Sequence, residues 1–151
     1  SLSSHMKEKV IAHIQQTLQE KINHLQGEMA ELQVALEGET KSTSGDKHET
    51  SRAMVQREIQ NLGDSLQNWN KMQGLAGTLK AKDCSSVELG ALLTTETNMF
   101  FISVALGKIS VDKQEIFCLA PTSPLAQKLM GKKKGETVEF NRNRHLIKEL
   151  F

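Results

Sequence analysis

Two stripes of apolar residues, joined by a short polar linker, constrain the fold of this chain more than any other feature. The first stripe runs from Ile11 to Leu36 in steps of three and four residues. The second runs from Val55 to Met72 in the same steps. That spacing places each set of residues along one side of an α-helix. Each stripe is too narrow for a helix that is buried on all sides, so each helix needs the other.

The linker at residues 38–45 is short and rich in Gly, Ser, Thr and Lys. Helices joined in this way pack as antiparallel neighbours, which predicts a coiled-coil hairpin over residues 6–76 with its tip near 38–50. About 30 residues per helix, at roughly 1.5 Å each, give an arm on the order of 45 Å long. A coiled coil between two copies of the chain is the alternative.

The pattern changes after residue 76, in favour of a small sheet domain over residues 77–151. Five short segments are rich in β-branched and aromatic residues, as strands are: 87–93, 99–106, 115–119, 137–140 and 145–150. Between the third and the fourth, Ser123 can cap a helix, Pro124 suits its first position, and Gly131 can end it. The predicted fold class is therefore α+β, with a helical hairpin followed by an antiparallel sheet and one short helix.

Charge and cysteine usage exclude several classes of function. A net charge of +1 does not indicate a general nucleic-acid or membrane binder. Cys84 and Cys118 lack the close spacing of zinc ligands and are expected to be free packing residues, as in a reducing cytoplasm. No segment resembles a signal peptide or a membrane span. Residues 1–5, before Met6, look like the remainder of an expression tag. We therefore expect a cytoplasmic protein.

Two carboxylates mark the expected tip. Asp46 and Glu49 are three residues apart, so at the start of a helix they share one face. Two carboxylates without His or Cys partners suit a hard cation such as Mg²⁺, although they are too few to hold it without oxygens from a partner or from phosphates. The structural alternative is a capping box, in which Asp46 caps the helix and Glu49 reaches back to it.

Basic and polar residues surround this acid pair, which suggests contacts with phosphates. A solvated helix end is the alternative for them, and His48 lacks the arrangement of a nucleophile's base. A second basic run follows the short helix and predicts a solvated turn, or a contact with an acidic protein surface. The candidate tip contacts are Lys41, Ser44, Lys47, His48 and Arg52, and the second run is Lys132, Lys133 and Lys134.

Two motifs in this order resemble the GreA/GreB transcript-cleavage factors of bacterial RNA polymerase. The first is Gly45-Asp46-Lys47-His48-Glu49 at the hairpin tip, and the second is Ser123-Pro124-Leu125-Ala126 followed by Leu129-Met130-Gly131-Lys132. The resemblance covers nearly the whole chain. It implies an FKBP-like C-terminal domain that docks on the polymerase through Ser123, Pro124, Leu125 and Lys132.

The same resemblance implies that the hairpin enters the secondary channel of the polymerase. Asp46 and Glu49 would there help the polymerase to hold a second Mg²⁺ and to cleave the 3′ end of backtracked RNA. The chain would act as a monomeric accessory factor, with no enzyme activity and no cofactor of its own.

The tip departs from the family pattern. Lys47 and His48 replace the usual Leu-Ser, and residues 50–53 replace an Asn, a small residue, a second acid and an aromatic. A secondary-channel regulator of initiation or pausing, without cleavage activity, is therefore the alternative function. A prolyl isomerase is disfavoured because the chain has no Tyr and its one Trp lies in the arm. A purely structural coiled-coil dimer would leave the sheet domain without a purpose.

Overall fold

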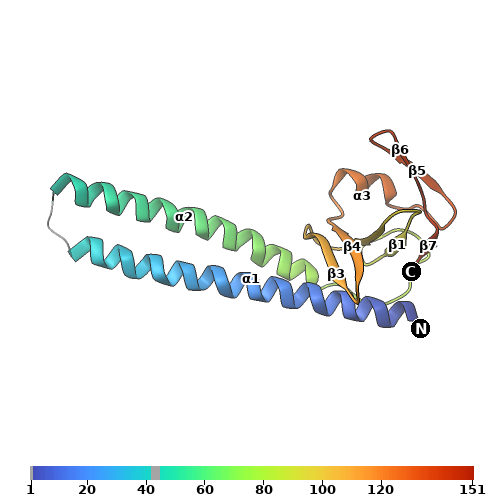
Figure 1. Ribbon diagram of the computed structural model, residues 1–151, viewed down its shortest axis with the longest axis horizontal. Helices are drawn as coiled ribbons and strands as arrows, with labels where there is room; N and C mark the ends of the chain where they lie inside the picture. Colours follow the sequence, from blue (N-terminus) through green and yellow to red (C-terminus); the bar gives the residue numbers. More distant parts are fainter. Residues whose placement is uncertain (1, 42–44) are drawn as a thin grey trace. The chain divides into compact units, whose positions relative to one another are not determined.

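The computed structural model describes residues 2–41 and 45–151, with side chains placed at 4–38 and 49–151. A helical hairpin is followed by a small mixed sheet domain with one short helix, which confirms the predicted architecture (Figure 1). The elements in chain order are α1 (Leu2–Lys41), α2 (Gly45–Ala76), β1 (Leu92–Thr94), β2 (Met99–Ile102), β3 (Gly107–Val111), β4 (Gln114–Leu119), α3 (Pro124–Leu129), β5 (Thr137–Phe140), β6 (Asn143–Leu146) and β7 (Glu149–Leu150).

Residues 16–73 form one compact unit, in which α1 and α2 pack against each other. Leu18, Ile22 and Leu25 of α1 are buried along the predicted stripe. Polar contacts join the two helices, since Gln73 donates to Gln19 at 2.8 Å and Lys21 Nζ lies 5.6 Å from the Trp69 ring centre. The hairpin is thus formed within one chain, as predicted.

Gly63 lies inside α2, where glycine weakens a helix. Among the described residues, no neighbouring atom is close enough to require a residue without a side chain there. A methyl group added at Gly63 would meet only Met29 Cε, at an ordinary contact distance of 3.8 Å. Gly63→Ala is therefore expected to stabilise the hairpin by about 0.5–1 kcal/mol, because alanine loses less backbone entropy on folding. Urea denaturation followed by Trp69 fluorescence measures this. Gly131→Ala is the contrasting control, since φ of +81° makes alanine unfavourable there.

The second compact unit joins residues 2–15 of the first helix to residues 74–151. This division differs from the predicted boundary after residue 76, because Val10, Ile11 and Ile14 are buried in the sheet domain's unit. The helix also begins at Leu2, whereas residues 1–5 were excluded from the fold prediction as the remainder of a tag. Residues 2–5 therefore form the first turn of α1.

The main sheet has five strands in the order β3-β4-β2-β1-β7, and β5 pairs with β6 in a separate hairpin. The prediction of an antiparallel sheet was wrong for one pair, since β2 and β4 are parallel. The chain passes from β2 to the edge strand β3 and returns as β4 between them. The chain reverses its direction between β2 and β3 and again between β3 and β4, so β4 runs parallel to β2.

One strand, β3, was missed by the sequence analysis. It is joined to β4 by a two-residue turn at Asp112 and Lys113, whose φ values are +51° and +68°. Asn141 and Arg142 form a turn with the same φ values between β5 and β6. Positive φ at both central residues is typical of type I′ turns, which usually carry glycine. Without glycine, the turn before β4 left no clear sequence signal.

Three predicted strands had the wrong limits. The segment 99–106 is a strand only as far as Ile102, and residues 103–106 connect β2 to β3. Residues 87–91 precede β1 as a connection, in which Val87 exchanges backbone hydrogen bonds with Gly131 and Lys132, both at 2.8 Å. The segment 145–150 is divided between β6 and β7 at Ile147 and Lys148. The backbone N–H of Lys148 donates to Thr94 and that of Ile147 to Glu136, so the chain changes partner between them.

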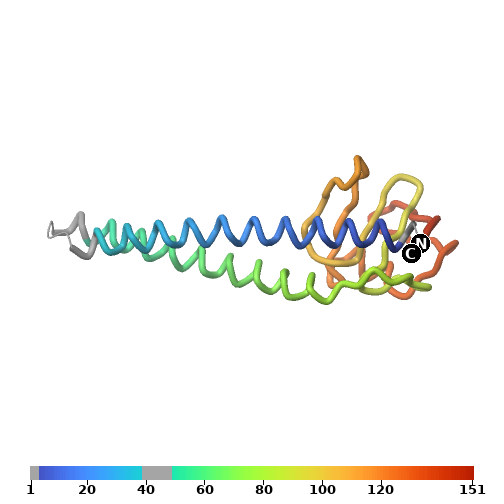
Figure 2. The backbone as a smooth tube through the Cα atoms, turned by 90° about the horizontal axis from the view of Figure 1, so that it is seen from below, coloured from blue at the N-terminus to red at the C-terminus, as the bar shows by residue number. Residues whose placement is uncertain are grey.

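Both faces of the main sheet are covered. Phe100 and Ile102 of β2 pack with Ala126 and Leu129 of α3 in one buried cluster. Phe101 lies between them in the strand, so it points to the opposite face, and it is completely buried. The first turns of α1 lie beside the sheet (Figures 1 and 2). Val10, Ile11 and Ile14 of these turns are buried in the same unit as Phe101.

Cys118 of β4 gives this core a dependence on pH. Burial raises the pKa of its thiol from 9.0 to about 11, against the opposing hydrogen bond with Ser103. Above pH 9 the unfolded chain loses this proton while the folded chain keeps it, so stability falls between pH 9 and 11. The loss is about 2–3 kcal/mol. Denaturation of wild type and Cys118→Ala at pH 8 and 11 measures it. The free energy of unfolding of the variant should fall less between the two pH values, because the variant lacks this thiol.

No helix in the described ranges 2–41 and 45–151 combines the length and apolarity needed to cross a membrane.

Candidate functional site

The start of α2 presents one described carboxylate to solvent. The helix begins at Gly45, and Glu49 is an exposed residue of its first turns. A capping box would place Asp46 just before the first helical residue, but α2 already includes it. Positions 46 and 49 therefore lie three apart within the helix, on one side of it. Acidic residues in the first turn are also stabilised by the partial positive charge of a helix N-terminus.

The other predicted tip residues are described only in part. Arg52, three residues after Glu49, is half-buried. The predicted contact Ser44 and the side chains of Lys41, Asp46, Lys47 and His48 lie outside the described residues. Their predicted roles therefore stay predictions.

The donor set at the tip can be compared with what a Mg²⁺ ion requires. Asp46 and Glu49 are carboxylates, the oxygen ligands that this hard cation prefers. Among the described side chains, no group of three or more His, Cys, Asp or Glu residues is placed to hold a metal. The chemistry of the pair therefore fits a Mg²⁺ ion that a partner shares, and two carboxylates are too few for a site within this chain alone.

The predicted docking residues surround the short helix α3. Ser123 is its N-cap, with the side-chain oxygen accepting from the Ala126 N–H at 3.3 Å. Leu125 packs partly against the buried cluster under α3. Pro124 is exposed and Lys132 is partly exposed. The structure thus leaves Pro124 and Lys132 available to a partner, while Ser123 and Leu125 have structural roles.

A polar hollow of about 460 Å³ lies beside these residues, between α3 and β5. Lys132 lines it together with Lys128, which the sequence analysis did not single out. Glu139 is the one acid in its lining. Lys133 and Lys134 are both exposed, and Lys134 pairs with Glu149 at 3.7 Å. The predicted basic run therefore continues onto the helix as a positively charged surface.

The sequence analysis also missed a second polar hollow, of about 310 Å³, between the β1–β2 turn and the β5–β6 hairpin. Asn98, Arg144 and His145 are among its lining residues. The His145 ring stands edge-on to Phe100, with ring centres 6.2 Å apart. No local motif could have revealed this group, because only the pairing of distant segments brings it together.

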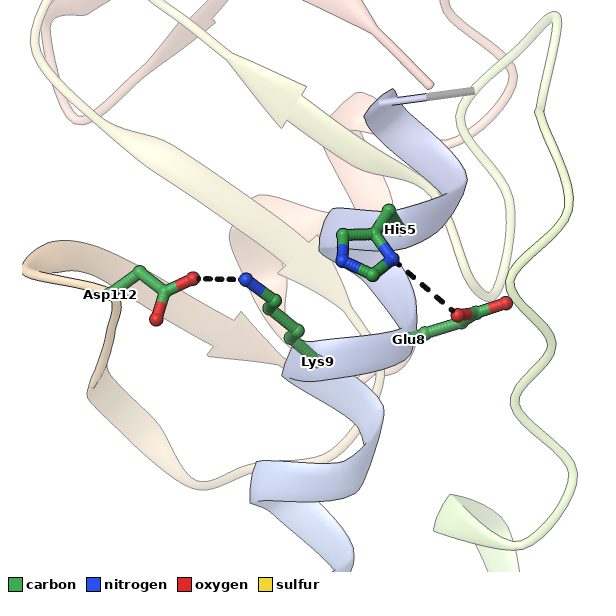
Figure 3. A network of polar contacts seen from close by, with 4 residues as sticks. All are labelled: His5, Glu8, Lys9 and Asp112. Atoms are coloured by element: carbon green, nitrogen blue, oxygen red, sulfur yellow. Dashed lines mark hydrogen bonds and ion pairs between the residues drawn. The ribbon is translucent and has the colours of Figure 1, made fainter.

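One ion pair joins the start of α1 to the β3–β4 turn, and a second polar contact lies within α1 itself. Lys9 Nζ lies 2.9 Å from Asp112 Oδ2 in the β3–β4 turn, and His5 Nδ1 lies 3.9 Å from Glu8 Oε2 (Figure 3). All four side chains are about half exposed or more. Exposed pairs of this kind contribute little to stability, so Lys9–Asp112 is a minor part of what holds α1 against the sheet.

No protein-family model matches this chain, and no curated protein matches it either. Among solved structures, it is similar to one titled "Structure of the transcription factor Gfh1". The TM-score is 0.40 and the sequence identity 13%, over 90% of this chain and 94% of the other. Because both values are low, the similarity carries no argument about the function of this chain.

Proposed function

We propose that this chain binds bacterial RNA polymerase through its secondary channel and stimulates cleavage of backtracked RNA. One observation carries the proposal: α1 ends at Lys41, α2 begins at Gly45 and packs back along it, and Glu49 is exposed in the first turns of α2. The motif there, Gly45-Asp46-Lys47-His48-Glu49, is the one that resembles the Gre factors. A narrow arm with a carboxylate near its end suits a site that can be reached only through a channel.

In this proposal the acid pair completes a metal site that the polymerase begins. Asp46 and Glu49 would hold one Mg²⁺ ion jointly with the polymerase. When bound, that ion would assist attack of water on an RNA phosphodiester. The role of this chain is to bring two fixed negative charges on one helical turn, in a position set by the packing of α1 against α2.

The sheet domain would dock on the outer rim of the channel. Its basic surface at Lys128, Lys132 and Lys133 would meet acidic side chains of the polymerase, with Pro124 beside them. Such charge complementarity accelerates and orients association more than it adds affinity. Binding is therefore expected to weaken as the salt concentration rises.

Halted, backtracked elongation complexes test the proposal. We expect the wild-type chain to shorten labelled RNA from its 3′ end, and Asp46→Ala and Glu49→Ala to bind polymerase without doing so. The chain alone should leave free RNA intact, because it brings only part of the site. Failure to bind polymerase would refute the proposal. Binding without RNA shortening would favour the alternative, a channel regulator of initiation or pausing. Lys47, His48 and Arg52, which depart from the Gre pattern at the tip, motivate that alternative.

A further inference from the structure

A buried lysine and a buried cysteine meet in the sheet domain's unit. Lys7 of α1 is completely buried, and Cys84 is 7% exposed. The Lys7 amine donates to the Lys82 carbonyl oxygen at 2.6 Å and to Cys84 Sγ at 3.7 Å. The two residues are 77 positions apart in the sequence. A nitrogen nucleophile and a free thiol are thus held in direct contact.

The surroundings of Lys7 are unusual for a lysine side chain. Ammonium groups are seldom completely buried, and those that are usually have a carboxylate partner. The described hydrogen bonds of Lys7 go to a carbonyl oxygen and a thiol, while Asp83 and Glu88 act on it electrostatically. Neither partner that it touches carries a full negative charge while the thiol is protonated.

Burial changes the protonation of both groups. It lowers the pKa of Lys7, against the opposing effects of Cys84, Asp83 and Glu88. A larger share of Lys7 is therefore present as the neutral, nucleophilic amine. Burial also raises the pKa of Cys84, and the charge of Lys7 opposes that rise while Glu88 adds to it. The thiol should consequently react slowly with oxidants, and reaction should require sustained exposure.

We propose that Lys7 and Cys84 form a reversible covalent nitrogen–sulfur cross-link when the protein is exposed to a peroxide. The contact between Nζ and Sγ carries the proposal, because each reacting atom already has the other as its neighbour.

The chemistry proceeds in two balanced steps. The Cys84 thiol releases its proton, and the thiolate attacks one oxygen of hydrogen peroxide. The O–O bond breaks, the sulfur keeps that OH group as a sulfenic acid, and the departing hydroxide takes up the released proton as one water molecule. The neutral Lys7 amine then attacks the sulfenic sulfur, an N–S bond forms, and the S–O bond breaks. The hydroxyl leaves with the amine proton as a second water molecule. The sulfur is oxidised and the peroxide reduced, while the cross-linked protein has lost two hydrogen atoms. A thiol reductant reverses the link.

The second cysteine offers a natural comparison. Cys118 is also buried, but its described polar neighbour is the Ser103 hydroxyl, which is not an amine. A sulfenic acid at Cys118 would therefore lack an adjacent nitrogen nucleophile of this kind. The cross-link is expected at Cys84 only.

The cross-link would tie the first turns of α1 to the segment that precedes β1. It would close a long chain loop between Lys7 and Cys84, which removes conformational freedom from the unfolded state. We expect the thermal unfolding midpoint of the sheet domain's unit to rise by roughly 10 °C after peroxide treatment. Reduction should reverse this rise.

Peptide mapping after peroxide treatment tests the proposal on the full chain. Trypsin cannot cleave after a modified Lys7, so the expected product joins peptide 1–9 to peptide 83–108, with the mass of two hydrogen atoms lost. The link should disappear on reduction and form faster at pH 9 than at pH 7, because it needs both the thiolate and the neutral amine. Protein unfolded in concentrated guanidinium before treatment should not form it.

Three variants complete the test. Cys118→Ser should still form the link, whereas Cys84→Ser and Lys7→Arg should not. The peptide map of the wild-type chain tests the proposal without these variants, so poor folding of the Lys7 variant would not affect the conclusion. Any of three results would overturn the proposal. The first is a disulfide that joins peptides 83–108 and 114–128, and the second is a link that retains an oxygen atom. The third is sulfinic or sulfonic acid at Cys84 while trypsin still cleaves the chain after Lys7.

Discussion

Replacing Glu49 with alanine is expected to reduce stimulated RNA cleavage by about 100-fold or more while leaving polymerase binding nearly unchanged. Glu49 is exposed in the first turns of α2, so the substitution removes a charge without disturbing a packed contact. The loss would arise because one of the two carboxylates shared with the polymerase is missing. The measurement is the rate of RNA shortening in backtracked complexes at saturating factor.

Glu58→Ala is the matched control for this experiment. Glu58 is also an exposed glutamate of α2, but it lies more than two turns beyond Glu49. Its loss should leave cleavage within about twofold of wild type, since surface substitutions away from a site have small effects. Glu49→Gln separates charge from size and should fail like the alanine variant. Equal activity of all three variants with wild type would exclude Glu49 from the cleavage site.

Ile14→Ala is expected to destabilise the sheet domain's unit by about 2–4 kcal/mol, although Ile14 belongs to the first helix. Its side chain is completely buried, in the segment of α1 that forms one unit with residues 74–151. Truncation would leave a cavity in the core of that unit. Hydrogen exchange in β2 and β4 measures the effect, because their most protected amides report opening of the whole unit.

His13→Ala provides the comparison for Ile14→Ala. His13 is the exposed neighbour of Ile14 on α1, so its truncation should change the free energy of unfolding by less than about 0.5 kcal/mol. If Ile14→Ala left exchange in β2 and β4 as slow as in wild type, the start of α1 would not belong to the core of this unit.

The hairpin was predictable because its signal is local and repeated. Ile22 and Leu25 mark one period of the stripe on α1, and the short linker requires an antiparallel return. The helix α3 was predictable for the same kind of reason, since Ser123, Pro124 and Gly131 each suit their positions in it.

The sheet was harder to predict, because its order depends on contacts between distant segments. The parallel pairing of Phe100 with Phe117 has no counterpart in the local sequence. The turn at Asp112 and Lys113 adopts positive φ without glycine, so the strand before it was missed. Lys7 belongs to an amphipathic helix start, and only the tertiary fold shows that its amine is buried.

For the candidate site at the start of α2, the sequence could predict only which residue types occur and how far apart they are in the chain. Asp46 and Glu49 are three apart in the sequence, and the helical start at Gly45 fixes what that spacing means in space. The basic surface was predicted from Lys132 and its neighbours, but Lys128 joins it only because α3 packs beside β5.

The most direct test of the central claim is to locate the start of α2 in a complex with RNA polymerase. A photo-crosslinking amino acid at Ala53, an exposed position about one turn after Glu49, would report what lies beside it. The proposal predicts cross-links to polymerase residues that line the secondary channel, and to the 3′ end of backtracked RNA. Cross-links confined to the outer surface of the polymerase, or none in a complex that forms, would contradict it.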